Sequence, residues 1–349
     1  MNKKEILSKV EALTLYTGTY GRKKCTCSCI GCTQGITSRR NIEFQGNIEQ
    51  IKTIIKYLPN LKTAYILGNP DVSVDTEFCN LAAKEFIKNN IKVMFSTSGY
   101  NGLKVVKELT KDINPKDIEY ISYSIDTLDN DKLQYLKGNK KINIEQIEEA
   151  IKYCIKIGIK VKIQPTLWEI NQEDYGEIIN RYCKWGIKWF TFHVGSFETI
   201  DGKIPLKHIE PEKWVNIIKD INKIAKEKDL KVKVPKIFIE EKEQEEYRKK
   251  QKLYCQNGGT DLQIWLQKDG IKATVCPILS AVYPKYLFDL EKEDVKLVSK
   301  NNEGCMVSGN CLDERIISQS KENNGKEFII NNKKYNNVCR YYADRIKYE

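Results

Sequence analysis

The order of apolar segments and turn residues in the sequence predicts an α/β fold with parallel strands. Between residues 11 and 194, six short β-prone segments alternate with segments in which apolar residues have helical spacing. This alternation requires crossover connections, which are right-handed between parallel strands. A doubly wound sheet and a part of a (β/α) barrel both satisfy the pattern, and both place binding and catalytic groups at the carboxyl ends of the strands.

The expected elements are bounded by residues that start helices or end strands. Gly18 ends the first strand, and Asn47 is a suitable N-cap for the first helix, with Glu49 in its first turn. The six expected strands cover residues 11–17, 62–67, 92–97, 118–125, 160–166 and 188–194. The expected helices cover about 47–58, 75–89, 102–111, 143–157 and 171–184. A polar connection closed by Gly138 is expected after the fourth strand.

The C-terminal part has a different pattern. It begins with an expected helix, a short strand and a strongly charged helical stretch, at about 211–228, 231–235 and 240–254. Two alternating runs, 261–266 and 271–275, then flank Asp269-Gly270. Because Asp-Gly between two such runs favours a tight turn, this segment predicts a β-hairpin.

The composition fits a globular protein outside the membrane. Of the 349 residues, 41% are hydrophobic and 30% are charged, and no apolar run reaches the roughly 18–20 residues that span a bilayer. The N-terminus has no apolar segment of signal-peptide length, so we expect a cytoplasmic location. The net charge is +11, but lysine is spread along the whole chain, so the charge does not predict a nucleic-acid partner.

Twelve cysteines are the most informative residues. In a chain that is not exported we expect reduced thiols, so clusters of cysteines predict metal sites rather than disulfides. Cys79, Cys154 and Cys183 lie singly within expected helices, and we expect them to be buried, small apolar side chains. The others form one group at positions 25, 27, 29 and 32 and a second group at positions 255, 276, 305, 311 and 339.

The first group follows the first expected strand. Cys25, Cys29 and Cys32 have the spacing C-x3-C-x2-C. Three thiolates on one tight loop can hold three irons of a [4Fe–4S] cluster and leave the fourth iron open to a substrate or cofactor. A zinc site that also includes Cys27 is the alternative, although structural zinc sites usually take two separated cysteine pairs.

With this loop, the sequence resembles the radical S-adenosylmethionine (radical SAM) superfamily over about residues 11–195. The resemblance implies a partial (β/α)6 TIM-like barrel with Cys25, Cys29 and Cys32 as cluster ligands. Motifs similar to those of the family end the second, third and fourth strands, and they are Gly68-Asn69-Pro70, Thr97-Ser98-Gly99 and Ser122-Tyr123-Ser124-Ile125-Asp126. The cofactor-binding residues that the resemblance implies are Gly68, Asn69, Pro70, Thr97, Ser98, Ser124 and Asp126.

The resemblance also implies the chemistry. The cluster's open iron would bind S-adenosylmethionine, whose reductive cleavage gives a 5′-deoxyadenosyl radical that takes a hydrogen atom from the substrate. Two features depart from the family pattern. The residue before the third cysteine is usually bulky and is Gly31 here, and Cys27 is an additional cysteine that we expect to be a free thiol beside the cluster.

The C-terminal cysteines resemble those of the auxiliary-cluster domains called SPASM and twitch, because Cys255 and Cys276 bracket the predicted hairpin. The resemblance implies one auxiliary [4Fe–4S] cluster. Its implied ligands are Cys255, Cys276, Cys305 and Cys311, with Cys339 as a competing ligand, and a zinc site is the alternative. The chain would then divide into a radical SAM barrel (1–200), a helical linker region (201–250) and a twitch/SPASM-like iron–sulfur domain (251–349).

The resemblance implies a radical SAM oxidoreductase or maturase that acts on a peptide or a small molecule, by dehydrogenation or by a crosslink in a ribosomally made peptide. The alternatives are an epimerase, a tRNA-modifying radical SAM enzyme, and a non-catalytic iron–sulfur or zinc protein for binding or electron transfer. An electron donor such as flavodoxin or ferredoxin is expected. Because only 24 residues precede Cys25, we expect a leader-binding domain to be absent or to be supplied by a separate protein, which favours a small molecule without excluding a peptide. Asp126, Glu169 and His193 are candidates to face the substrate, although a lone histidine in a strand is more often structural.

Overall fold

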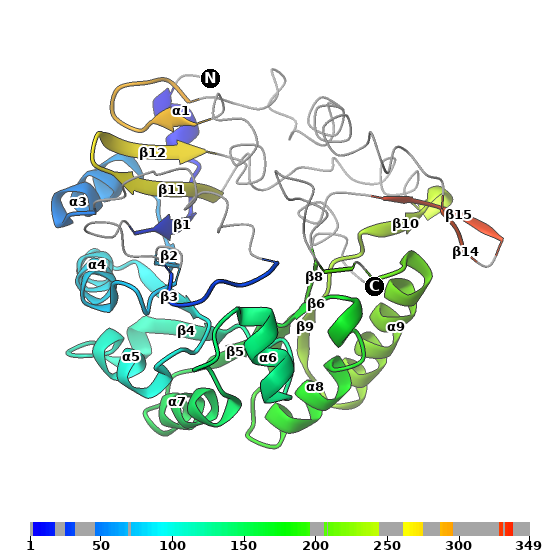
Figure 1. Ribbon diagram of the computed structural model, residues 1–349. Coiled ribbons are helices and arrows are strands. Elements are labelled where there is room, and N and C mark those ends of the chain that lie inside the picture. The colour runs from blue at the N-terminus through cyan, green and yellow to red at the C-terminus, as the bar shows by residue number, and fades with distance from the viewer. Residues whose placement is uncertain are drawn as a thin grey trace.

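The structure is a computed structural model that describes residues 3–17, 25–31, 46–68, 71–195, 206–207, 209–243, 261–274, 287–295, 328–330 and 332–337. Its main sheet has ten strands in the order β13-β12-β11-β1-β2-β3-β4-β5-β7-β9. From β1 to β9, each strand runs parallel to the next. Figure 1 shows that this part of the sheet curves and that the helices lie on its outer face. A doubly wound sheet would carry helices on both faces, so the architecture is the partial barrel.

The parallel strands and their covering helices follow the predicted order. The strands are β1 (Ala12–Tyr16), β2 (Thr63–Ile66), β3 (Lys92–Thr97), β4 (Ile118–Tyr123), β5 (Val161–Ile163), β7 (Trp189–Thr191) and β9 (Lys231–Lys233). The helices outside them are α3 (Ile48–Tyr57), α4 (Thr76–Lys88), α5 (Gly102–Leu109), α7 (Ile144–Lys156), α8 (Tyr175–Cys183) and α9 (Pro211–Glu227). The expected N-cap is confirmed, because the side chain of Asn47 accepts a hydrogen bond from the backbone N–H of Gln50 at 3.0 Å.

Two expectations for the first six units were wrong in detail. The fifth and sixth predicted strands are each interrupted, and their ends form a separate parallel pair, β6 (Thr166–Leu167) and β8 (His193–Val194). In the fifth strand, Pro165 precedes the second piece and has no N–H to donate to a ladder. The polar connection expected before Gly138 contains a helix, α6 (Asn130–Lys137), capped by the side chain of Asp129. Its apolar face is small, which is why the hydrophobic pattern did not indicate it.

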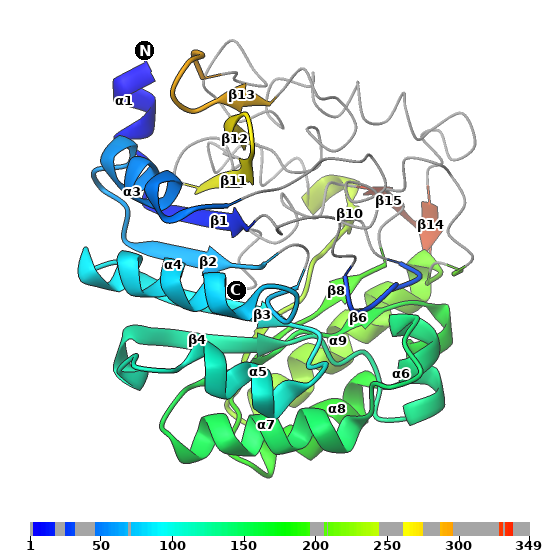
Figure 2. The same ribbon diagram turned by 60° about the vertical axis from the view of Figure 1, so that its left-hand side comes forward.

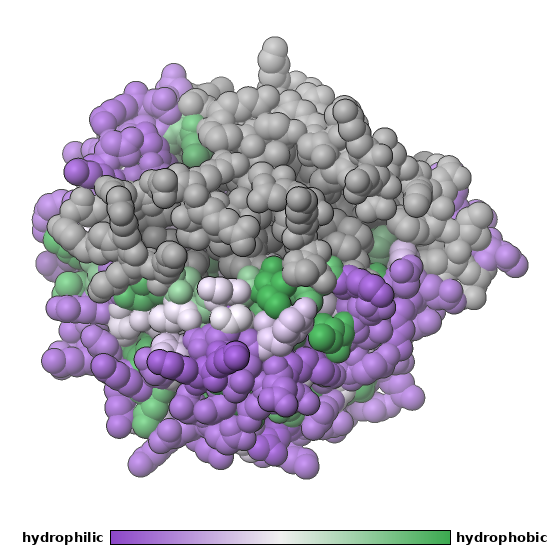
Figure 3. All heavy atoms as spheres, viewed as in Figure 1, coloured by the Kyte–Doolittle hydropathy of each residue, from purple (hydrophilic) through white to green (hydrophobic). Residues whose placement is uncertain are grey.

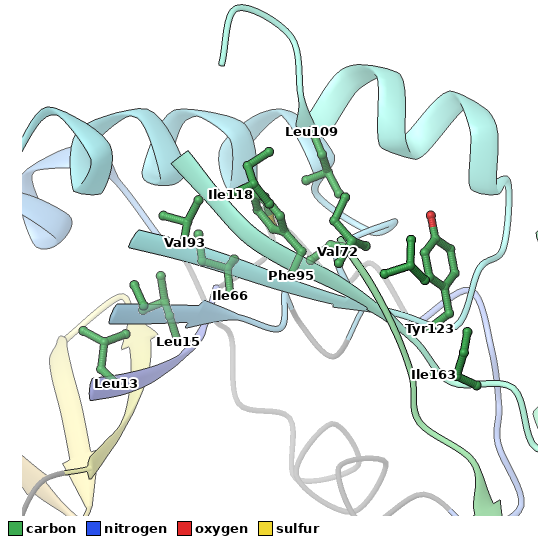
Figure 4. Packing of buried hydrophobic residues seen from close by; sticks show 14 of the residues in the cluster. Leu13, Leu15, Ile66, Val72, Val93, Phe95, Leu109, Ile118, Tyr123 and Ile163 are labelled. Carbon is green, nitrogen blue, oxygen red and sulfur yellow. The ribbon is translucent and has the colours of Figure 1, made fainter. Parts of the chain in front are cut away.

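The main hydrophobic core lies between the barrel strands and the outer helices. Figure 4 shows alternate strand residues pointing toward the helices, among them Leu13, Leu15, Ile66, Val93 and Phe95. Side chains along a strand alternate between the two faces of the sheet. The residues between those of the core, such as Tyr65 and Ser122, therefore face the inside of the barrel.

The predicted hairpin is present and belongs to the main sheet. β11 (Asp261–Gln267) and β12 (Gly270–Thr274) pair antiparallel, and β13 (Phe288–Asp289) adds to β12. β11 also pairs with β1, in parallel. The rings of Tyr16 and Trp265 stack across this junction with centroids 4.7 Å apart. A second, antiparallel sheet joins β10 (Phe238–Glu240), β15 (Lys333–Asn337) and β14 (Phe328–Ile330).

Short helical segments complete the described elements. They are α1 (Lys3–Leu7) and two 3-10 turns, η1 (Pro115–Asp117) and η2 (Glu169–Asn171). The described surface over the outer helices is largely hydrophilic in Figure 3, as expected for helices whose apolar faces pack on the sheet. Within the described ranges, no helix has both the length and the apolarity that crossing a bilayer requires.

Candidate functional site

The cysteine loop, defined here as residues 25–31, lies at the carboxyl ends of the barrel strands. Figure 2 shows it in blue between these strand ends and α6. The backbone N–H of Ile30 donates to the carbonyl oxygen of Leu136 at 3.1 Å. The side-chain amide of Asn139 donates to the carbonyl oxygen of Thr26 at 2.8 Å. The loop is thus fixed to the end of α6, more than a hundred residues away in sequence.

Gly138 makes this attachment possible. It is the C-cap of α6, with a left-handed φ of 56° that favours glycine. A Cβ atom at this position would also overlap the carbonyl oxygen of Ser28 in the cysteine loop. The glycine expected from the sequence to close a connection is therefore also the point where α6 touches the loop.

The three described cysteines of the loop differ in exposure. Cys25 and Cys29 are half-buried, whereas Cys27 is buried and its thiol donates to the hydroxyl of Ser98 at 3.5 Å. A hydrogen bond with Cys29, followed by that with Ser98, outweighs burial and lowers the pKa of Cys27 to about 7. Within the part of the chain that the structure describes, none of the three forms a disulfide. Cys32, the third expected ligand, lies outside the described residues.

The turn after β2 packs closely and is tied to the end of β3 by Asp71. Gly68 has a φ of 74°, and a Cβ atom there would meet the backbone of Asp71 at 2.5 Å. The carboxylate of Asp71 accepts hydrogen bonds from the Ser98 N–H at 2.5 Å and from the Thr97 hydroxyl at 3.3 Å. Asn69 and Pro70 lie outside the described residues. Sequence reasoning missed Asp71, although its place after Gly-Asn-Pro, at the end of a strand, was the available signal.

Ser124 and Asp126, beyond the end of β4, both contact the buried side chain of Lys137. The Lys137 ammonium lies 2.7 Å from Oδ2 of Asp126 and donates to the Ser124 hydroxyl at 2.7 Å. The other carboxylate oxygen of Asp126 accepts from the Thr166 N–H at 2.7 Å. Burial alone lowers the pKa of Lys137, but the charges of Asp126 and of the nearby Cys29 outweigh it and hold this pKa above its ordinary value. A fixed cation therefore lies beside the cysteine loop.

Sequence reasoning did not single out Lys137. It is one of 58 lysines and arginines, and nothing local distinguishes it. Its burial and its partners arise from contacts between separate segments.

The remaining substrate-facing candidates lie in different surroundings. Glu169 is exposed, and its carboxylate lies 3.8 Å from the ammonium of Lys207. His193 is half-buried in β8, with Nε2 at 3.2 Å from the amide nitrogen of Gln164. The structure therefore places His193 inside the barrel and Glu169 at its surface.

A row of polar side chains crosses the inside of the barrel next to His193. The Tyr65 hydroxyl donates to the amide oxygen of Gln164 at 2.8 Å and lies 2.7 Å from the Ser122 hydroxyl. Burial raises the pKa of Tyr65. The ammonium of the buried Lys162 lies 4.6 Å from the centroid of the Tyr120 ring, in cation–π contact. Hydrogen-bonding groups, aromatic rings and the Lys162 ammonium thus line the described interior.

The other cysteines fall into two sets. Cys79 and Cys154 are fully buried, which confirms the expectation of small core side chains, and Cys183 is half-buried. The five C-terminal cysteines lie outside the described residues. Among the residues that the structure describes, no group of three His, Cys, Asp or Glu side chains is placed to hold a metal.

A curved sheet of parallel strands with a cysteine loop at its carboxyl rim defines the class of barrel proteins that carry their chemistry on strand ends. Residues 22–182 match the family described as the Radical SAM superfamily. This part of the chain is therefore a radical SAM domain, and the family implies a [4Fe–4S] cluster and S-adenosylmethionine. No curated protein matches the sequence.

Solved structures with similar folds include SuiB from Streptococcus suis and anSMEcpe with bound AdoMet. SuiB is 18% identical over 88% of this chain and 69% of its own, with a TM-score of 0.62. anSMEcpe with AdoMet is 13% identical over 84% of this chain and 81% of its own, with a TM-score of 0.58. At these identities the likeness shows the fold.

Proposed function

We propose that the chain is a radical SAM enzyme in which Cys25, Cys29 and Cys32 hold a [4Fe–4S] cluster. The observation that carries the proposal is the cysteine loop fixed at the carboxyl rim of a barrel whose sequence matches the superfamily. The donor set fits such a cluster, because Cys25 and Cys29 are half-buried thiols on one short loop and Cys29 lies near the buried ammonium of Lys137. When bound, the cluster and S-adenosylmethionine supply a 5′-deoxyadenosyl radical that takes hydrogen from the substrate.

The residues implied to bind S-adenosylmethionine are proposed for that role, and they are Gly68, Asn69, Pro70, Thr97, Ser98, Ser124 and Asp126. Two features of the described ones support it. The left-handed turn at Gly68 and its tie to the end of β3 give a rigid backbone cradle at the rim. Asp126 has both carboxylate oxygens engaged, so its part in that role would be indirect, through Lys137 and the start of β6, which it holds in place.

We further propose an auxiliary [4Fe–4S] cluster on Cys255, Cys276, Cys305 and Cys311, with Cys339 as the competing ligand. It would belong to a twitch/SPASM-like region at 251–349, after a barrel at 1–200 and a linker region at 201–250. The support is the sequence pattern, in which Cys255 and Cys276 bracket the hairpin that the structure describes. Such a cluster would accept an electron from the substrate and favour an oxidative modification.

A peptide substrate is favoured over a small molecule. SuiB has been solved with its precursor peptide SuiA, at 18% identity and a TM-score of 0.57 with this chain. anSMEcpe has been solved with AdoMet and the Kp18Cys peptide, at a TM-score of 0.56. By this likeness we propose an oxidoreductase or maturase acting on a peptide. From the sequence pattern alone, we further propose a cytoplasmic location, a flavodoxin- or ferredoxin-type electron donor and a separate leader-binding protein.

Anaerobic reconstitution tests the proposal. The protein is loaded with iron and sulfide and reduced, and 5′-deoxyadenosine is measured after S-adenosylmethionine is added. We expect 5′-deoxyadenosine from the wild type, none from Cys29→Ala, and an undiminished amount from the matched control Cys154→Ala, whose thiol is buried in the core.

The iron content separates the parts of the proposal. About eight irons per chain would support two cubane clusters, and about four would remove the auxiliary cluster. A loaded cluster without 5′-deoxyadenosine would refute the enzyme and favour an electron-transfer protein.

A further inference from the structure

The space beside Gly31 is filled by a tryptophan from a distant segment. A Cβ atom at Gly31 would overlap Cζ2 of the Trp168 ring and would lie 2.8 Å from Cε2. Gly31 directly precedes Cys32. The bulk that the sequence lacks at position 31 is therefore supplied by Trp168, which follows β6.

A second glycine borders the same ring. A Cβ atom at Gly195, after β8, would overlap the opposite side of the indole bicycle, at Cε3 and Cδ2. Trp168 is 3% exposed and packs with Leu136 and Leu206. The indole thus lies in a slot whose walls at positions 31 and 195 must be glycine, because a Cβ atom at either position would overlap the ring.

The backbone of Trp168 is fixed without help from the cysteine loop. Its N–H donates to the side-chain oxygen of Asn171 at 2.7 Å. The amide nitrogen of Asn171 donates to the carbonyl oxygens of Asp126, at 2.7 Å, and Thr166, at 2.9 Å. Asn171 is 1% exposed and is hydrogen-bonded to the backbone at Asp126, after β4, and at Thr166, in β6. The position of the Trp168 backbone is therefore set by the barrel.

The cysteine loop therefore has two supports at its end. On one side, Ile30 is bonded to the carbonyl of Leu136. On the other side, Gly31 lies against the indole. Consecutive Cα atoms are only about 3.8 Å apart, so the place of Gly31 limits where the next residue in the sequence, the proposed ligand Cys32, can lie.

We propose that Trp168 is a positioning residue that fixes Gly31, the residue directly before the proposed ligand Cys32 in the sequence, and so supports cluster binding by the loop. This inference rests on the proposed function, because it concerns the same cluster. Trp168 acts through the contact with Gly31, and the contact is steric. A steric contact predicts that a larger side chain at position 31 can be compensated by a smaller side chain at position 168.

A swap of side-chain volume tests the proposal. Gly31→Phe alone, Trp168→Ala alone and the double variant are reconstituted anaerobically with iron and sulfide. Iron per chain is measured, together with the electron paramagnetic resonance spectrum of the reduced protein before and after S-adenosylmethionine is added. We expect each single variant to lose iron and to lose the spectral change, and the double variant to regain both.

Matched controls separate this contact from general effects of the substitutions. Gly176→Ala places a methyl group in open space. Trp185→Ala removes a half-buried indole from the surface near α8. Both controls are expected to load iron as the wild type does. The unfolding temperature of each variant without iron is measured in parallel.

The outcomes are distinguishable. Single variants that load iron and respond to S-adenosylmethionine like the wild type would overturn the inference, as would a double variant no better than either single one. A wild type that holds no iron would refute the proposed function instead. In that case the unfolding temperatures test the steric contact between Gly31 and Trp168. A double variant with a higher unfolding temperature than either single variant would support the contact, and one with no higher temperature would overturn it.

Discussion

Asp126→Asn removes the carboxylate that neutralises the buried Lys137. The ammonium and carboxylate are 2.7 Å apart, and their side chains are 4% and 10% exposed. Removing one partner of such a pair leaves an uncompensated buried charge, which costs about 3–5 kcal/mol of unfolding free energy. Because Asn can still accept from the Thr166 N–H, we expect a loss near the lower end, about 3 kcal/mol.

A double-mutant cycle isolates the pair. Lys137→Met leaves the Asp126 carboxylate without its cation, and the double variant Asp126→Asn/Lys137→Met removes both charges. Since replacing both members of a buried pair is often nearly neutral, we expect a coupling energy of at least about 2 kcal/mol. The assay is denaturant unfolding of the cluster-free protein under reducing, anaerobic conditions.

The exposed pair Lys62–Glu11 serves as the control. Its atoms are also 2.7 Å apart, but its side chains are 66% and 49% exposed, so we expect a coupling below about 1 kcal/mol. Equal coupling energies for the two pairs would refute the argument that burial makes the Asp126–Lys137 pair strong.

The sign of the pH dependence follows from the raised pKa of Lys137. A lysine with a raised folded pKa gives stability that is fully present below the unfolded lysine value of about 10.4 and is lost as the pH rises through the folded value. The coupling energy should therefore stay constant between about pH 6 and pH 9. A steady fall across this window would contradict the assignment of Lys137 as a permanent cation.

Two further predictions concern the loop and the inside of the barrel. Gly138→Ala should cost more unfolding free energy than Gly158→Ala, because both glycines have positive φ but only Gly138 abuts Ser28. The positive φ by itself accounts for a loss of about 1 kcal/mol in each variant. Equal losses in the two variants would rule out the contact with Ser28. Nitrogen-15 NMR of the two histidines should show neutral His193 with its proton on Nδ1, since Nε2 accepts from Gln164. Gln164→Leu should restore the commoner Nε2–H form, and finding that form in the wild type would disprove the hydrogen-bond direction.

Short-range sequence patterns were sufficient to predict much of the fold. The alternation of β-prone and helical segments requires parallel strands with crossovers, and the Asp-Gly turn requires a hairpin. Each pattern depends on residues within one or two turns of chain, so it can be read without knowledge of distant contacts. The helix α6 was not predicted because its buried face is small. The fifth strand was predicted to continue through Pro165, where the structure interrupts it.

The sequence by itself determined the order of the elements and the residues available at the strand ends. Only the tertiary structure decided that β11 lies beside β1, that Lys137 is the buried cation near the cysteine loop, and that Trp168 fills the space beside Gly31. The physical reason is that burial, charge pairing and steric fit are properties of pairs of residues. β11 and β1, Lys137 and Cys29, and Trp168 and Gly31 are each separated by more than a hundred residues, and neither member of a pair carries a local sign of the other.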